Sequence, residues 1–175
     1  RKTLREQAGS IDDYLKSLEI VISVHHNDAS TIPRVSQLTQ KTNQFNLTTK
    51  RYSVADIQRF VDNNDVYAFR AEDRFGDMGI VGVVIVLDNQ IDSFLLSCRA
   101  FGRQIEDVML QTVVNHVDRF PMFATYVKSK KNDMTKAFYD EHGFVKVSSA
   151  SQTGTYRLTS ELKAVPSQIK DVKWI

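Results

Sequence analysis

Apolar and polar residues repeat with two different periods along the chain, and its first part shows both. Residues 1–18 repeat apolar side chains at steps of three and four, which predicts a lead-in helix despite the presence of Gly9. The β-branched run 19–26 is followed by a turn-forming Asn-Asp pair and predicts a strand. Pro33 suits the first turn of a helix, and the apolar spacing after it predicts a helix over 33–45.

The middle of the chain predicts a short helix and then a meander of strands. Ser53 and Asp56 have the spacing of a capping box, which places a helix at about 54–62. Three β-rich segments follow, and turn-rich sequence separates them, so we expect antiparallel pairing. These segments are 66–72, 78–87 and 90–98.

The last part of the chain returns to helical spacing and then closes with β-rich sequence. Apolar residues recur at helical steps over 105–120, which predicts the longest helix after the lead-in. The elements expected after it are a strand at 122–127, a helix at 132–142 ended by Gly143, and hairpin strands at 144–149 and 154–159. Residues 160–175 show little periodicity and are not assigned. The whole pattern predicts an α/β (α+β) fold with a mixed, mostly antiparallel sheet flanked by helices.

The composition indicates one domain whose stability needs no disulfide and no structural metal. The 175 residues are 42% hydrophobic, and 23 basic and 21 acidic side chains are interspersed, which gives no electrostatic footprint for nucleic acid. A single cysteine excludes an intrachain disulfide and a cysteine-based zinc site, and it suits a reducing cytoplasm. No apolar run approaches the roughly 20 residues that span a bilayer, and no signal peptide is recognisable, so neither a membrane nor an exported location is expected.

The chain opens at Arg1 inside sequence that already predicts a helix, so we expect it to be part of a longer polypeptide. On this interpretation residues 1–18 lead in from an upstream domain, 19–160 form the main domain and 161–175 form a tail.

Two local patterns resemble the GNAT family of acyltransferases, whose element order the prediction matches. The sequence from Arg99 to Gln104 resembles the family's pyrophosphate loop, in which backbone N–H groups hold coenzyme A, although Gln104 stands where the family prefers Gly or Ala. Asn132, followed by the segment 137–144, resembles the family segment in which a tyrosine, here Tyr139, protonates a departing thiolate. The resemblance implies that Arg99, Gly102, Arg103 and Gln104 contact the phosphates or the pantetheine arm.

A narrower resemblance covers nearly the whole chain. The polar segment 34–52 and the sequence 97–103 are similar to the C-terminal region of FkbH-like proteins, which join a HAD-type phosphatase domain to a GNAT-like domain. Some of those proteins load a glyceryl unit onto an acyl carrier protein. The resemblance implies an acyl carrier protein and an upstream phosphatase domain as partners and Cys98 as the carrier of a glyceryl thioester. The Asp-x-Asp-x-Thr phosphatase signature is missing from this sequence.

Cys98 is the candidate nucleophile. It lies at the end of a predicted strand and just before a predicted helix, and Arg99 and Arg103 follow it closely. Both the helix start and the guanidinium groups would favour the reactive thiolate. The alternative is a small buried hydrophobic residue at a strand end. Tyr139 is a candidate general acid, and a core or surface aromatic is its alternative.

An amide- and hydroxyl-rich segment supplies the candidate substrate contacts. Neutral donors and acceptors suit a hydroxylated, uncharged acyl group. Helix-end capping and turn formation could instead use most of these side chains. The candidates are Gln40, Thr42, Asn43, Gln44, Asn46 and Thr48, with Asn132 from the GNAT-like segment.

The histidines are expected to have structural roles. His116 lies on the apolar face of the long predicted helix and is expected to be a hydrogen-bonded core or edge residue. His25 and His26 have no carboxylate at metal-ligand spacing, so no metal site is expected. His142 precedes the glycine that ends a helix, where a cation suits the helix dipole.

The sequence therefore predicts an acyltransferase domain that passes a glyceryl or similar short acyl group through a Cys98 thioester to an acyl carrier protein. No tightly bound cofactor is expected, and the phosphopantetheine thioester of a carrier protein, or coenzyme A, acts as donor or acceptor. One alternative is a coenzyme A-dependent GNAT N-acyltransferase without a covalent enzyme intermediate. Another is a noncatalytic module that docks a carrier protein.

Overall fold

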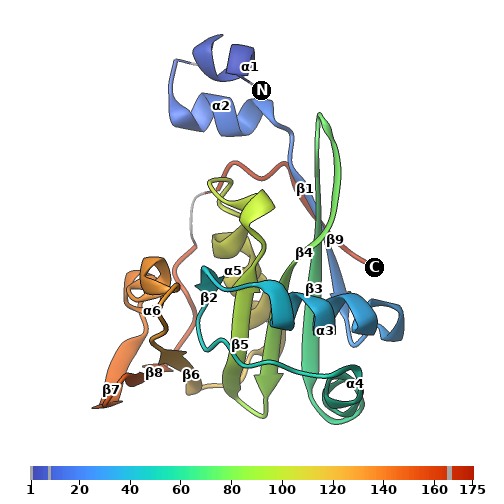
Figure 1. Ribbon diagram of the computed structural model, residues 1–175. Coiled ribbons are helices and arrows are strands. Elements are labelled where there is room, and N and C mark those ends of the chain that lie inside the picture. The colour runs from blue at the N-terminus through green and yellow to red at the C-terminus, as the bar shows by residue number, and fades with distance from the viewer. Residues whose placement is uncertain (1, 8, 165–166) are drawn as a thin grey trace.

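The computed structural model describes residues 2–7, 9–164 and 167–175, which build one mixed sheet with helices on both faces (Figure 1). The strand order is β7-β8-β6-β5-β4-β3-β1-β9, and the short β2 pairs with β5. The α-helices are α1 (Lys2–Gln7), α2 (Ile11–Ser17), α3 (Ile32–Lys41), α4 (Val54–Asn63), α5 (Ile105–Val117) and α6 (Phe138–Glu141). The strands are β1 (Val21–His26), β2 (Phe45–Asn46), β3 (Asp65–Asp73), β4 (Gly76–Leu87), β5 (Gln90–Leu96), β6 (Met122–Val127), β7 (Val145–Ala150), β8 (Thr153–Leu158) and β9 (Asp171–Trp174). Short 3₁₀ turns are η1 (Ala29–Thr31), η2 (Cys98–Ala100) and η3 (Asp133–Thr135).

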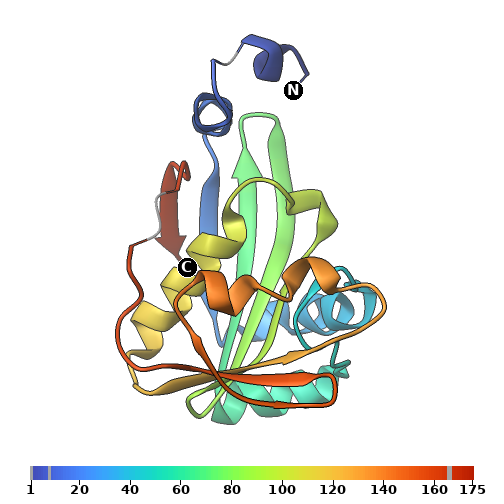
Figure 2. The same cartoon turned by 90° about the vertical axis from the view of Figure 1, so that its left-hand side faces the viewer.

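Alternation along the central strands assigns each residue to one of two cores. On β3, Val66 and Ala68 pack with α3 and α4, whereas Tyr67 and Phe69 pack with α5 on the opposite face. Figure 2 shows these helices on opposite sides of the sheet. The sheet is therefore covered on both faces, which explains the near-continuous apolar sequence of β4.

The predicted meander, capping box and closing hairpin are confirmed. β3, β4 and β5 pair antiparallel in chain order, and β7 pairs antiparallel with β8. The Ser53 hydroxyl accepts the Asp56 N–H at 3.1 Å, and the Asp56 carboxylate accepts the Ser53 N–H at 2.9 Å, so α4 begins where the spacing predicts.

The predicted lead-in helix is wrong as one piece. It forms the two short helices α1 and α2, and the Ser10 hydroxyl caps the second of them by accepting the Asp13 N–H at 3.1 Å. Ala8, one of the residues in the predicted apolar repeat, lies outside the described residues.

The other differences have local causes. The helix predicted over 33–45 ends at Lys41, because the chain turns extended at Thr42 and then pairs with β5 as β2. The helix predicted over 132–142 divides into η3 and a single turn, α6. The unassigned tail supplies β9, which pairs parallel with β1.

The parallel strands β5 and β6 pair only at one end and then part. Gln90 and Ile91 pair with β6, whereas farther along β5 the edge is taken by β2. Leu47 bridges the gap, since its N–H donates to the Phe94 carbonyl at 3.1 Å and its carbonyl accepts the Val127 N–H at 2.8 Å. The chain itself thus fills the space where the two parallel strands diverge.

Candidate functional site

A hollow of about 670 Å³ surrounds Cys98. Its walls are formed by α3, the extended segment after it, the end of β5 with η2, and the turn after β6. We call it the Cys98 hollow; its lining residues are Arg34, Leu38, Lys41, Thr42, Asn43, Gln44, Phe45, Leu96, Ser97, Cys98, Arg99, Phe101 and Lys131.

The Cys98 thiol is exposed at the first position of η2. The Ser97 N–H donates to the Val81 carbonyl at 2.7 Å, and the Ala100 N–H donates to the Ser97 carbonyl at 2.9 Å, so backbone bonds fix this turn to β4. The alternative of a buried hydrophobic cysteine is therefore excluded. The predicted position just before the long helix is wrong, because α5 begins at Ile105 and a loop separates it from Cys98.

Positive charge dominates the Cys98 hollow. Its basic residues are Arg34, Lys41, Arg99 and Lys131, and no carboxylate belongs to its lining among the described residues. Burial, and then the nearby Arg99, lower the pKa of Arg34. Because like charges gather here without an acidic neighbour in the wall, the hollow favours an anionic ligand.

The loop that resembles a pyrophosphate site is tied to its own chain. Arg103 donates to the carbonyl of Arg99 at 2.9 Å and to that of Phe101 at 3.2 Å. The Arg103 Nε lies 4.0 Å from the fully buried carboxylate of Asp73. Arg103 therefore holds the loop and does not reach into the hollow, whereas Arg99 does.

Gly102 and Gln104 shape the same loop. Both have left-handed backbone, with φ of 74° and 62°, and this conformation is easy for glycine and costly for glutamine. The Gln104 side chain accepts the Gln168 N–H at 2.9 Å, which fastens the C-terminal segment to the start of α5. The Gln104 side-chain oxygen is thus bonded to the protein's own backbone.

Glu106 lies in the first turn of α5, beside this loop. Burial raises the pKa of its carboxyl, and its Oε2 is buried without a hydrogen-bond partner among the described residues. A carboxyl group already occupies the helix start, where a ligand phosphate would otherwise be favoured.

The polar segment divides between the hollow and the protein interior. Thr42, Asn43 and Gln44 line the Cys98 hollow. Gln40 instead donates to the Tyr52 carbonyl at 3.2 Å, and the buried Thr48 hydroxyl donates to the Asp92 carbonyl at 3.1 Å. Half of the predicted substrate contacts in this segment therefore serve the fold.

Asn46 and Asn132 are fully buried and act together as backbone braces. Asn46 donates to the Thr42 carbonyl at 3.1 Å and accepts the Thr49 N–H at 2.8 Å. The Asn132 amide donates to the Asn46 carbonyl at 2.8 Å, which joins the turn after β6 to β2. Both side chains therefore serve capping and turn formation, the alternative to substrate binding.

Tyr139 lies in the core, with 1% of its surface exposed. Its ring packs against Phe138, Phe144 and Tyr156, and burial raises the pKa of its hydroxyl above the ordinary value. It does not line the Cys98 hollow. The core-aromatic alternative therefore describes Tyr139, and a general acid for a thiolate in that hollow must come from elsewhere.

The histidines have hydrogen-bonded partners. His116 Nδ1 lies 2.7 Å from the Tyr67 hydroxyl, as expected of a structural edge histidine, and His25 and His26 lie 2.8 Å from Asp28 and Asp65. Within the described residues, no group of three or more His, Cys, Asp or Glu side chains could hold a metal ion. No helix in the same part of the chain is long and apolar enough to cross a membrane.

No protein-family model matches the sequence, and no curated protein matches it. Solved structures do. The ribosomal-protein-S18-alanine N-acetyltransferase from Escherichia coli is 11% identical with a TM-score of 0.56 over 82% of this chain and 96% of that one. The PaiA N-acetyltransferase from Thermoplasma acidophilum, solved with coenzyme A, is also 11% identical, with a TM-score of 0.56 over 79% of this chain and 99% of that one. A GNAT-family acetyltransferase from Listeria monocytogenes is 12% identical, with a TM-score of 0.55 over 76% of this chain and 91% of that one.

This chain has the GNAT acetyltransferase fold. The mixed, mostly antiparallel sheet flanked by helices and the element order predicted from the sequence are confirmed. Identities this low establish the fold and leave the reaction to the site. The similarity to FkbH-like proteins, the glyceryl group and the partner domains stay predictions.

Proposed function

We propose that this GNAT-fold chain is an acyltransferase in which Cys98 takes a short acyl group from a phosphopantetheine thioester and passes it to an acceptor thiol. The observation that carries the proposal is the exposed thiol in a hollow whose charged lining residues are all basic. An exposed thiol is open to an acyl donor, and its thiolate is the nucleophilic form of cysteine. The basic lining favours an anionic, phosphate-bearing donor.

The chemistry is two thioester exchanges. The Cys98 thiolate attacks the acyl carbon, a new C–S bond forms, and the donor C–S bond breaks to release the donor thiolate, which takes up a proton from solvent. The acceptor thiolate then attacks the Cys98 thioester in the same way and regenerates the enzyme thiolate. Each step breaks and makes one thioester, so neither an oxidant nor an external energy source is needed. The basic lining lowers the energy of each anionic tetrahedral intermediate.

The acyl group follows from the neutral part of the lining. Thr42, Asn43 and Gln44 offer a hydroxyl and two amides beside the thiol. Hydroxyl and amide groups of this kind can donate hydrogen bonds to, and accept them from, the hydroxyls of a short acyl chain. A glyceryl group carried by an acyl carrier protein, as the FkbH-like resemblance implies, has such hydroxyls.

A second candidate function is direct coenzyme A-dependent transfer to an amine, without a covalent enzyme intermediate. The likeness in fold to N-acetyltransferases, one of them solved with coenzyme A, favours it. The two candidates differ in one respect that can be measured, because only the first requires the Cys98 thiol.

Intact-mass spectrometry tests the proposal. The protein is mixed with glyceryl-loaded carrier protein or with acetyl-coenzyme A, beside matched Cys98→Ala and Cys98→Ser variants. We expect one acyl increment on the wild-type chain and none on either variant. Acylation of an added amine that survives Cys98→Ala would refute the covalent route and establish the second candidate. Carrier binding with neither labelling nor turnover would leave a noncatalytic docking module.

A further inference from the structure

In the loop that the GNAT resemblance assigns to the phosphate of a phosphopantetheine donor, Arg99 is the side chain that faces the hollow around Cys98. Arg103 and Gln104 are engaged with the protein's own backbone, and the buried carboxyl of Glu106 lies in the first turn of α5. Arg99 is thus the cation that this loop offers to a phosphate near Cys98, and further cations have to be sought outside the loop. A phosphate site of this kind rests on the proposed function, since it would hold the donor used there.

A second hollow, of about 230 Å³, adjoins the Cys98 hollow. Asn43 and Lys131 line both. The remaining lining residues of this second hollow, which we call the turn hollow, are Thr49, Arg51, Ser129 and Lys130. Its charged residues are all basic among those described, so the positive wall continues from the thiol to the turn after β6.

The turn that carries these lysines is held in one shape. The Ser129 N–H donates to Asn132 Oδ1 at 2.8 Å, and the Ser129 hydroxyl accepts the N–H groups of Lys131 and Asn132, each at 3.2 Å. Asn132 is fully buried and anchors the turn to the Asn46 carbonyl. The backbone beneath both exposed lysines is therefore preorganised, which lowers the entropic cost of binding an anion.

Arg51 adds a fixed guanidinium to the same wall. It donates to the carbonyls of Thr39 and Thr42 and to the side chain of Asn43. These acceptors are neutral, so the charge of Arg51 is positioned without being cancelled. A phosphate oxygen over the turn hollow would meet this charge together with those of Lys130 and Lys131.

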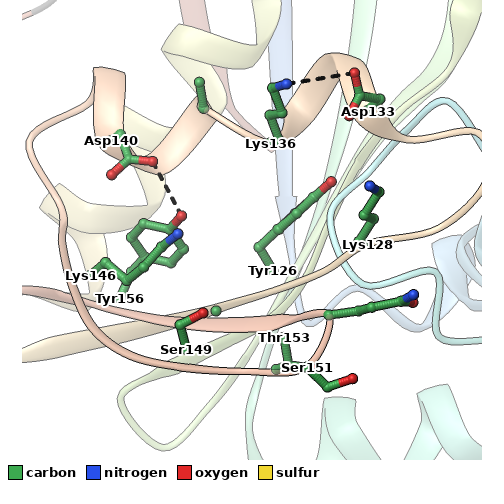
Figure 3. Close-up of a pocket in the computed structure, with 13 residues that line it drawn as sticks. Tyr126, Lys128, Asp133, Lys136, Asp140, Lys146, Ser149, Ser151, Thr153 and Tyr156 are labelled. Atoms are coloured by element: carbon green, nitrogen blue, oxygen red, sulfur yellow. Dashed lines mark hydrogen bonds and ion pairs between the residues drawn. The ribbon is translucent and has the colours of Figure 1, made fainter.

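A third hollow, of about 550 Å³, lies beside the β7–β8 hairpin (Figure 3). Lys128, one residue before Ser129, lines it together with Lys136 and Lys146. Lys136 pairs with Asp133 at 3.8 Å, and Asp140 accepts a hydrogen bond from the Tyr156 hydroxyl at 3.2 Å. Lys128 has no ion pair within the described part of the chain, so positive charge extends past the turn.

We propose that Arg51, Lys130 and Lys131 bind the phosphate of the phosphopantetheine thioester whose acyl carbon reaches Cys98. The donor then lies along the wall between the two adjoining hollows. The third hollow receives whatever the phosphate is attached to, which is a nucleotide in coenzyme A and a protein serine in a carrier protein.

Calorimetric titration with pantetheine and 4′-phosphopantetheine tests the phosphate site directly, because the two probes differ only in the phosphate. We expect phosphopantetheine to bind the wild-type chain about tenfold tighter, with a preference that weakens as salt is added. Lys130→Gln/Lys131→Gln should reduce the preference to less than about threefold. The matched control Lys163→Gln/Lys173→Gln, which removes the same charge from two other exposed lysines, should keep it.

Equal binding of the two probes by the wild-type chain, or a preference that persists in Lys130→Gln/Lys131→Gln, would overturn the site. Titration with coenzyme A identifies the source of the phosphate. If coenzyme A binds more tightly than phosphopantetheine, and Lys128→Gln/Lys146→Gln removes this difference, the donor is free coenzyme A. If the two bind equally, the donor is the phosphopantetheine arm of a carrier protein. Labelling of Cys98 is scored separately, so a phosphate preference without labelling refutes the proposed function and leaves the phosphate site standing.

Discussion

Asn132 is a small side chain, and we expect its removal to lower the free energy of unfolding strongly. Its side chain is fully buried and uses both ends: Nδ2 donates to the carbonyls of Asn46 at 2.8 Å and Val127 at 2.9 Å, and Oδ1 accepts the Ser129 N–H at 2.8 Å and the Tyr126 hydroxyl at 3.3 Å. Asn132→Ala removes the amide and leaves these four partner groups behind, in a site that water reaches poorly.

The cost can be worked from these bonds. A buried polar group that loses its partner costs about 1–3 kcal/mol. The Tyr126 bond is long, and part of the Ser129 site is reachable by water, so two carbonyls account for most of the loss. We expect Asn132→Ala to lower the free energy of unfolding by about 3 kcal/mol, which for a chain of this size corresponds to a fall in Tm of about 6–12 °C.

Urea unfolding followed by circular dichroism measures this value, with Asn115→Ala as the matched control. Asn115 is exposed on α5 and bonds only the neighbouring Gln111 side chain at 3.2 Å among the contacts described, so its loss should cost less than about 0.5 kcal/mol. A loss below about 1 kcal/mol for Asn132→Ala would show that Asn132 is not the brace of this turn. Asn132→Asp places a buried carboxylate against the carbonyls of Asn46 and Val127, so it should cost at least as much as Asn132→Ala.

Three further predictions concern packing, pH and capping. A Cβ at position 82 would meet Met109 Cε at 2.7 Å and Sδ still closer, so Gly82→Ala should destabilise by about 1–3 kcal/mol in the same urea assay, and no change would refute this packing. Both ring nitrogens of His142 lie 2.7 Å from acceptors, one of them on Asp107, so the ring is held as an imidazolium and its pKa is raised. Its stabilisation should be present at pH below the unfolded value of about 6.5 and lost as pH rises through the higher folded pKa, and His142→Gln should flatten this slope in stability measured against pH. Ser53→Ala should cost about 1 kcal/mol by thermal melting, and an unchanged Tm would show that the capping box does not stabilise α4.

Much of the fold was predictable because its signals are local. The period of two along β3 places Val66 and Tyr67 on opposite faces, and the spacing of Ser53 and Asp56 sets the start of α4. β2 and β9 carry no such signal. Each is short and takes its conformation from a distant partner, β5 or β1, so no window of sequence around either could reveal it.

The candidate site was predictable only in part, for a chemical reason. Asn43 and Asn46 are three residues apart in the same polar run, yet one lines the Cys98 hollow and the other is buried as a backbone brace. An amide that binds a ligand and an amide that binds the chain's own carbonyls are the same residue in a sequence. Lys128, Lys130 and Lys131 form a tight basic cluster in the sequence, but nothing in that local pattern shows that Arg51 or Cys98 lies near it.

The filled gap between β5 and β6 bears on the order of the proposed reaction. Where the two parallel strands part, Leu47 occupies their backbone groups by bonding Phe94 and Val127. A thioester arm, whose amides need backbone partners, therefore cannot enter between the strands without displacing β2. Cys98 lies in the hollow on the α3 side, where the proposed donor and acceptor thiols would both approach it. On the proposed function, an acyl group held on the exposed thiol of Cys98 lets the donor and acceptor thiols bind in turn.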